Sequence, residues 1–171
     1  MNNLIITNNP MVIETLNEMG IGAEGFDEER LIDGSAVNSD EARFVDGSAV
    51  NSDEARFING DAVNSDEARF INGSVEVLLI AVRDMIYRGH RLVSHPSAAS
   101  IRMICSPYRT VIVSARPGAP DPAHARMAED VLTGYRRITR HRKTDIINAE
   151  SYKKIDLQLF LSAYAEPLPF L

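Results

Sequence analysis

Hydrophobic positions are densest between residues 75 and 86, and the chain is organised around this stretch. Apolar side chains recur there at the i, i+3, i+4 and i+7 spacing of one buried helix face: Val75, Leu78, Leu79, Val82, Met85 and Ile86. Ser74 is the predicted N-cap, because its hydroxyl can accept a hydrogen bond from a free N–H of the first turn. Gly89 predicts the end of the helix in a left-handed C′ position. Further apolar residues widen the face, so we expect neighbours on more than one side of this helix.

Short apolar runs before and after this helix predict strands at residues 3–7, 68–71, 91–94 and 108–114. Two more helices are predicted where a capping residue is followed by proline, at Asn9-Pro10 and at Asp121-Pro122. The second of these helices has the apolar stripe Met127, Val131, Leu132, Tyr135 and Ile138. A last helix is predicted, with one face formed by Tyr152, Ile155, Leu159, Phe160 and Ala163.

Residues 36–74 are three near-identical copies of a 13-residue unit that begins AVNSDEARF. A period of 13 fits none of the common solenoid lengths, so we interpret the repeat as an insertion in front of the central helix. Each unit is compatible with a two-turn helix or with a strand before a turn. The last copy is expected to supply the strand at 68–71. The copies at 36–61 have little apolar surface, and we expect them to form a surface or mobile excursion.

The alternation of strands and helices predicts an α/β fold, with one domain over residues 1–171. The sheet is expected to be small and mainly parallel, with about four strands flanked by helices. The connection from residue 94 to 108 has no helical pattern, so the direction of the last strand stays open and a mixed sheet is the alternative. Open α/β sheets bind ligands at the C-terminal ends of their strands. The ends after residues 7, 73 and 94 are expected to meet at one such edge.

The net charge of −6 combines two segments of opposite sign. Residues 36–74 have eight acidic side chains against three arginines, whereas residues 83–143 have twelve lysines and arginines against four acids. The basic run at 136–143 has no interleaved aromatic residues. This pattern favours a solvated helix end over nucleic-acid binding.

Cysteine usage and the apolar runs indicate the compartment. Cys105 is the one cysteine, so no internal disulfide can form, as is typical of a reducing cytosol. The N-terminus lacks the basic start of a signal peptide, and no apolar run approaches the roughly 20 residues of a membrane helix. We therefore expect a soluble cytoplasmic protein, and the oligomeric state stays open.

Polar side chains at the expected sheet edge form the candidate ligand site. Thr7, Asn8 and Asn9 follow the first strand, where the free N–H groups of a helix start can bind an anion. Ser74 and His95 are expected beside them, with His95 as an acid or base. The set of binding candidates is completed by Arg83, His90 and Tyr108. The glycines of a nucleotide-binding turn are absent, so we expect no cofactor.

Each chemical interpretation has a structural alternative. Ser94 and His95 suggest a nucleophile and its base, but neighbours in a strand point to opposite faces and no GxSxG elbow is present. A histidine bonded to the backbone is therefore favoured. His90 and His95 have no third ligand at a fixed spacing, which disfavours a metal site. Arg83 and Asp84 are more typical of a solvated pair near a helix end than of a catalytic pair.

Three segments of the sequence resemble the GrdX family. They are LIITNNPMV at 4–12, FINGS followed by VRDMIYRGHRLVSHP within 70–96, and SPYRTVIVS at 106–114. The resemblance is loose over 120–171, and the repeat and the residues 97–105 depart from the family pattern. Members of this family are small proteins encoded with the glycine, sarcosine and betaine reductase systems of amino-acid-fermenting anaerobes. The resemblance implies a pathway association and no mechanism.

Two functions of different classes are consistent with these observations. The first is a non-catalytic accessory protein whose partners are protein components of the reductase system. The second is a small ligand-binding protein, or an enzyme, that acts on a small anionic metabolite at the sheet edge.

Overall fold

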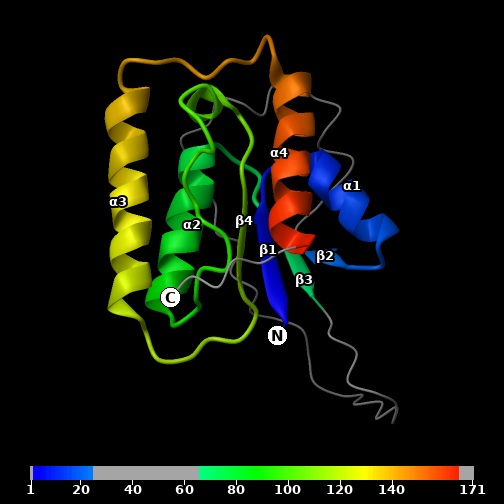
Figure 1. Cartoon of the computed structure of the whole chain (residues 1–171), viewed down its shortest axis with the longest axis vertical. Helices are drawn as coiled ribbons and strands as arrows, with labels where there is room; N and C mark the ends of the chain where they lie inside the picture. The colour runs from blue at the N-terminus through cyan, green and yellow to red at the C-terminus, as the bar shows by residue number, and fades with distance from the viewer. Residues whose placement is uncertain (1, 25–65, 166–171) are drawn as a thin grey trace.

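The computed structural model describes residues 2–24 and 66–165, which form a sheet between two layers of helices (Figure 1). α1 (Pro10–Glu18) and α3 (Pro122–Thr139) begin directly after Asn9 and Asp121 in the sequence, and these residues cap them as predicted. α2 (Val75–Tyr87) begins behind Ser74, whose hydroxyl accepts a hydrogen bond from the backbone of Val77. The copies of the repeat at 36–61 lie outside the described residues. Across the described ranges, no helix combines the length and the apolar character that crossing a bilayer requires.

The sheet has the strand order β2-β3-β1-β4 in the described part of the chain. β1 (Asn3–Thr7) is parallel to β3 (Glu67–Phe70), and β3 is parallel to the two-residue β2 (Ala23–Glu24). β4 (Thr110–Ser114) pairs with β1 in the antiparallel direction. The α/β class is confirmed, and the direction that the sequence left open is antiparallel. The sheet is therefore mixed.

The prediction of a strand at residues 91–94 is wrong, because this segment makes only an isolated bridge between Leu92 and Val113 of β4. The N–H groups of Val93 and Ser94 both donate to the carbonyl of Ile112, at 2.9 and 3.0 Å. Successive N–H groups of a regular strand point to opposite sides and cannot share one acceptor. The fourth strand of the sheet is instead β2, which follows the glycines at the end of α1 and lies at the opposite edge from β4.

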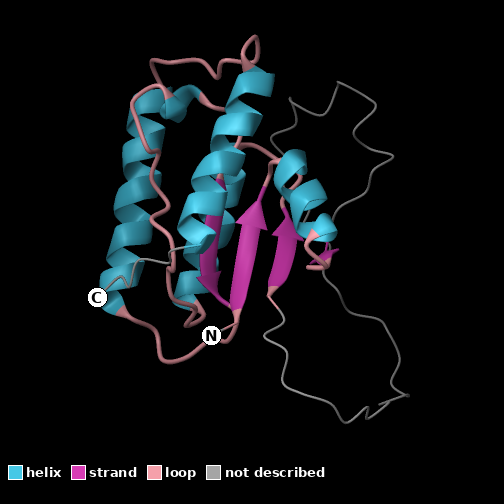
Figure 2. Cartoon of the chain, turned by 45° about the vertical axis from the view of Figure 1, so that its right-hand side comes forward, coloured by secondary structure: helices cyan, strands magenta, loops and turns pink. Residues whose placement is uncertain are grey.

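Alternate residues of β1 and β4 face two separate hydrophobic cores. Leu4 and Ile6 pack with α2 and α3, whereas Ile5 and Ile112 pack with α1 and α4. Figures 1 and 2 show these two pairs of helices on opposite sides of the sheet. α2 is covered by the sheet and by α3, as its wide apolar face predicts.

α4 (Ala149–Ala165) turns a different face to the core than its apolar pattern predicts. Its buried residues are Asp156 and Phe160, while Ile155 and Leu159 are exposed. The rotation brings a carboxylate inward, where the end of β1 and the start of β4 bind it. Near the end of α4, the hydroxyl of Tyr164 donates to Asp66 beside β3 at 2.6 Å, and burial raises the pKa of this tyrosine to about 12.

Gly89 ends α2 with a φ of +99°, the left-handed conformation that its position predicts. Its carbonyl accepts a hydrogen bond from the N–H of Gly118 at 2.8 Å. A Cβ on Gly89 would lie 2.0 Å from the carbonyl oxygen of Gly118. The turn after α2 and the turn before α3 therefore approach each other at a distance that only glycine permits.

Candidate functional site

The C-terminal ends of β1 and β3 meet the N-terminal end of β4 at one edge of the sheet, because β4 runs antiparallel to β1. Thr7, Asn8 and Asn9 lie at this edge and are buried. The side-chain nitrogen of Asn8 donates to the carbonyls of Gly73 and Pro107, at 3.0 and 2.9 Å. Asn8 thus joins the segments that follow β1 and β3 to the loop before β4.

A carboxylate of α4 reaches into the same edge. Asp156 is only 4% exposed, and its Oδ2 accepts hydrogen bonds from Asn9 Nδ2 at 3.0 Å and from the hydroxyl of Thr110 at 2.7 Å. Its Oδ1 accepts from the backbone N–H of Thr110 at 3.1 Å. Burial raises the pKa of Asp156, while these hydrogen bonds and the charge of Arg109 act in the opposite direction. The N-cap of α1 is therefore bonded to a negative charge of the chain itself.

Arg109 immediately precedes β4, and its side chain is only 5% exposed. Asn8 accepts its backbone N–H at 2.8 Å, and its Nη2 donates to the carbonyl of Met103 at 2.9 Å. Its Nε is buried without a hydrogen-bond acceptor among the described residues. Burial lowers the pKa of Arg109 and attraction by Asp156 opposes this, but a guanidinium keeps its charge in either case. A buried charge with an unused donor is costly, which makes Arg109 a candidate for binding a ligand.

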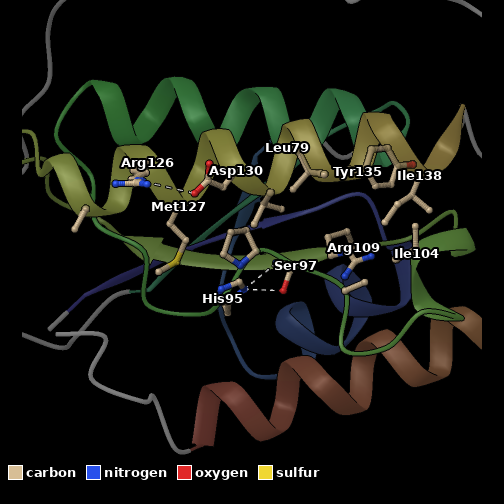
Figure 3. A pocket seen from close by; sticks show the side chains of 15 residues that line it. Leu79, His95, Ser97, Ile104, Arg109, Arg126, Met127, Asp130, Tyr135 and Ile138 are labelled. Atoms are coloured by element: carbon tan, nitrogen blue, oxygen red, sulfur yellow. Dashed lines mark hydrogen bonds and ion pairs between the residues drawn. The ribbon is translucent and has the colours of Figure 1, made fainter.

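Arg109 lines a cavity of about 590 Å³ between α3 and the loop that follows residue 94 (Figure 3). α3 contributes an apolar stripe at helical spacing, formed by Met127, Val131, Gly134, Tyr135 and Ile138. The sequence pattern had placed most of this stripe in the core. The opposite wall includes Leu79 of α2, Ile104 and the residues 95–98. Arg126 and Asp130, which are exposed and 3.8 Å apart, also line the cavity.

His95 lines this cavity, whereas Ser94 is bonded to β4. Nδ1 of His95 accepts a hydrogen bond from the backbone of Ser97 at 3.1 Å. The hydroxyl of Ser94 accepts the backbone N–H of Ile112 at 2.8 Å. The two neighbouring side chains therefore have separate partners.

The other predicted binding residues do not line the cavity. Ser74 caps α2, and Arg83 forms a 2.7 Å salt bridge with the next residue of the same helix. Nδ1 of His90 lies 2.7 Å from a carbonyl oxygen of β4. The ring of Tyr108 lies 5.6 Å from the ammonium group of Lys153. Within residues 2–24 and 66–165, no three His, Cys, Asp or Glu side chains are grouped as a metal site would require.

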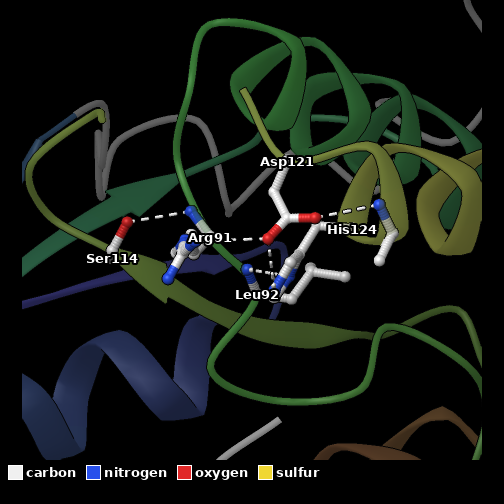
Figure 4. A network of polar contacts seen from close by, with 6 residues as sticks. Arg91, Leu92, Ser114, Asp121 and His124 are labelled. Carbon is white, nitrogen blue, oxygen red and sulfur yellow. Dashed lines mark hydrogen bonds and ion pairs between the residues drawn. The ribbon is translucent and has the colours of Figure 1, made fainter. Parts of the chain in front are cut away.

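A second polar cluster connects the start of α3 to the segment after α2 (Figure 4). Asp121 accepts a hydrogen bond from Arg91 at 3.2 Å and lies 3.9 Å from Nε2 of the buried His124. Nδ1 of His124 accepts the backbone N–H of Leu92 at 3.0 Å. The cap bond from the backbone of Ala123 lowers the pKa of Asp121. This cluster holds the segment after α2 against α3.

Sequence reasoning did not select Arg109 or Asp156, the two buried charges of the site. Arg109 could have been selected as a site residue from its place in SPYRTVIVS, where it lies just before a run of buried strand residues. Asp156 lies four residues before Phe160, which is buried on the same face of α4. In both cases, the spacing from buried neighbours places a charged residue on the inward face of its helix or strand.

Comparison with known families gives one result. A family model described as GrdX-like protein matches residues 55–165, which is more than half of the chain. The match includes β3, β4, α2, α3 and α4, and thereby every residue that lines the cavity. No curated protein and no solved structure matches the chain significantly.

Proposed function

Since the chain belongs to the GrdX-like protein family, we propose that it is a non-catalytic accessory protein of the glycine, sarcosine and betaine reductase systems that binds a small anionic metabolite. The family supports the association with this pathway. The cavity beside Arg109 supports the binding of an anion. Binding rather than catalysis is proposed because Ser94 and His95 have separate partners.

The main support for an anionic ligand is the Nε–H group of Arg109, which donates no hydrogen bond among the described residues. Its Nε has no acceptor among the described residues, although the guanidinium is buried at the wall of a cavity. A carboxylate or phosphate oxygen would accept this N–H in a charge-assisted hydrogen bond, which is about twice as strong as a neutral one. The nearby Asp156 uses its oxygens on Asn9 and Thr110, so it leaves this donor to a ligand.

Replacing Arg109 by methionine is expected to remove anion binding, because methionine keeps the length of the side chain without its donors. The wild-type protein should be stabilised against heat by carboxylates or by phosphate, and each variant is compared with its own ligand-free melting temperature. We expect Arg109→Met to lower the affinity at least about tenfold, the value of one charge-assisted hydrogen bond. Arg116→Met is the control, because this arginine is exposed and does not line the cavity. An unchanged ligand-induced shift in Arg109→Met would refute the proposal.

A second candidate function, the docking of an acidic protein component of the reductase system, is favoured by a surface at the end of α3. We call it the basic surface, and it consists of Ile101, Arg137, Arg140, His141, Arg142, Lys143, Ile146 and Ile147, all exposed. Ile147 is 97% exposed, and Ile101 and Ile146 are more than half exposed. Interfaces combine apolar anchors with complementary charge in this way.

Charge reversal tests the docking function. We expect the tagged protein to recover reductase subunits, identified by their peptides, from an extract of glycine-fermenting cells, and to lose them as the salt concentration rises. The variant Arg140→Glu with Ile147→Asp should recover at least about tenfold less, whereas Arg116→Glu, an exposed residue outside the basic surface, should recover as much as wild type. Recovery of no reductase subunit at any salt concentration would contradict this function.

A further inference from the structure

We propose that the ligand of the cavity is a carboxylate with an apolar body of several carbons, and that glycine, acetate and phosphate are too small to fill it. This inference rests on the proposed anion binding by Arg109 and specifies the class of ligand. It is carried by four observations: where the buried charge lies in the cavity, what chemistry lines the rest of it, how large the cavity is, and where α3 leaves space.

The buried charge among the described lining residues, Arg109, is at one end of the cavity, and the exposed Arg126 lies toward the other end. Arg109 acts electrostatically on the hydroxyl of Tyr135, and Figure 3 shows the guanidinium beneath Tyr135 and Ile138. Met127 lies eight residues before Tyr135 on the same helix, which is about 12 Å along the axis at 1.5 Å per residue. A ligand bonded to Arg109 by its carboxylate therefore has room to extend along α3 toward Met127.

The walls along this path are mainly apolar. Leu79, Pro96, Met127 and Val131 line it, and the polar side chains of His95 and Ser97 also face it. Asp130 is the carboxylate among the described lining residues, and its side chain is 75% exposed and paired with Arg126. An amino acid bound to Arg109 would have to leave its ammonium group among mainly apolar side chains, at a desolvation cost that no buried carboxylate among the described lining residues offsets. The lining thus favours a carboxylate with a hydrocarbon body over a zwitterion.

The volume points to the same class of ligand. Glycine and acetate have five and four heavy atoms, which corresponds to roughly 120–150 Å³ at about 30 Å³ per water-sized group. The cavity is about 590 Å³, within the range of pockets for larger organic ligands. Burial of the additional CH₂ groups is then the main source of affinity.

Gly134 keeps the cavity open near the Arg109 end of this path. It lies inside α3, where glycine is a poorer helix former than alanine, and it lines the cavity. A Cβ built on Gly134 meets no heavy atom within 4 Å, so a side chain can begin there without a clash. A leucine at this position would occupy space that the proposed ligand needs, without disturbing the core.

Titration calorimetry with octanoate, acetate, glycine, phosphate and octanol as probes tests the inference on the full-length protein. We expect octanoate to bind at least about fiftyfold more tightly than acetate, the effect of burying three CH₂ groups. Gly134→Leu should weaken octanoate binding at least tenfold while melting no lower than wild type. Thr133→Leu, on the exposed side of the same helix, is the control and should bind like wild type. Octanol should bind weakly, because it has no charge for Arg109.

The outcomes separate this inference from the function on which it rests. If acetate or phosphate binds as tightly as octanoate, and Arg109→Met abolishes that binding, the inference that the ligand has an apolar body is refuted. The proposed anion binding by Arg109 is then still supported. If octanoate binds equally well to wild type and to Arg109→Met, or if no probe binds, both proposals fail. If Gly134→Leu binds octanoate like wild type, the ligand does not lie along α3 and the inference is overturned.

Discussion

Replacing Asp156 by alanine is expected to lower the free energy of unfolding by about 3–5 kcal/mol, the range for breaking a buried charged network by removing one partner. The variant leaves the side chain of Asn9 and both donors of Thr110 without their common acceptor. It also leaves the buried charge of Arg109 without the carboxylate that attracts it. Denaturant unfolding monitored by circular dichroism measures the change.

Two further variants in α4 help to interpret the stability change of Asp156→Ala. Gln158→Ala lies two residues further along α4 on its exposed side and should change the stability by less than about 0.5 kcal/mol. Asp156→Asn keeps the shape and one acceptor oxygen, so an intermediate loss is expected. A loss below about 1 kcal/mol in Asp156→Ala would show that the three donors find other partners and that the site does not depend on this residue.

Gly89→Ala should cost about 3 kcal/mol or more. The left-handed conformation costs a non-glycine residue about 1–2 kcal/mol. The added Cβ would also lie 2.0 Å from the backbone oxygen of Gly118, and backbone atoms cannot move aside as the end of a flexible side chain can. The hydrogen bond between these two glycines, at 2.8 Å, would be lost or distorted.

The matched control is Gly20→Ala. Gly20 also has a positive φ, +78°, but a Cβ there meets no heavy atom within 4 Å. This variant should show only the conformational cost, so the difference between the two melting curves measures the close approach of the turns at Gly89 and Gly118. Equal losses in both variants would mean that the approach is relaxed in solution.

The features that the sequence predicted correctly depend on local signals. Asn9, Ser74 and Asp121 cap their helices with side chains that act within the first turn, and Gly89 ends α2 by its own backbone conformation. These interactions need no information about the rest of the fold. The α/β class followed for the same reason, because the alternation of elements is visible along the chain.

The features that were missed depend on contacts between distant residues. The segment at 91–94 is apolar enough for a strand, but Ser94 and His124 supply side-chain partners to backbone groups that a strand would bond to its neighbour. α4 turns Asp156 inward although aspartate usually marks an exposed face. The cavity combines α2, α3 and the connection at residues 95–109, so no single pattern in the sequence outlines it.

Arg109 lies within the field of Asp156 and at the wall of the cavity, so the proposed anion binding would be linked to proton binding by Asp156. The guanidinium holds down the pKa of Asp156, while burial raises it. An anion bound to Arg109 offsets the positive charge, so the pKa of Asp156 rises further in the complex. Binding is then accompanied by proton uptake in the pH window between the free and bound pKa values of Asp156. By linkage, affinity increases as the pH falls through this window, as long as the ligand stays ionised.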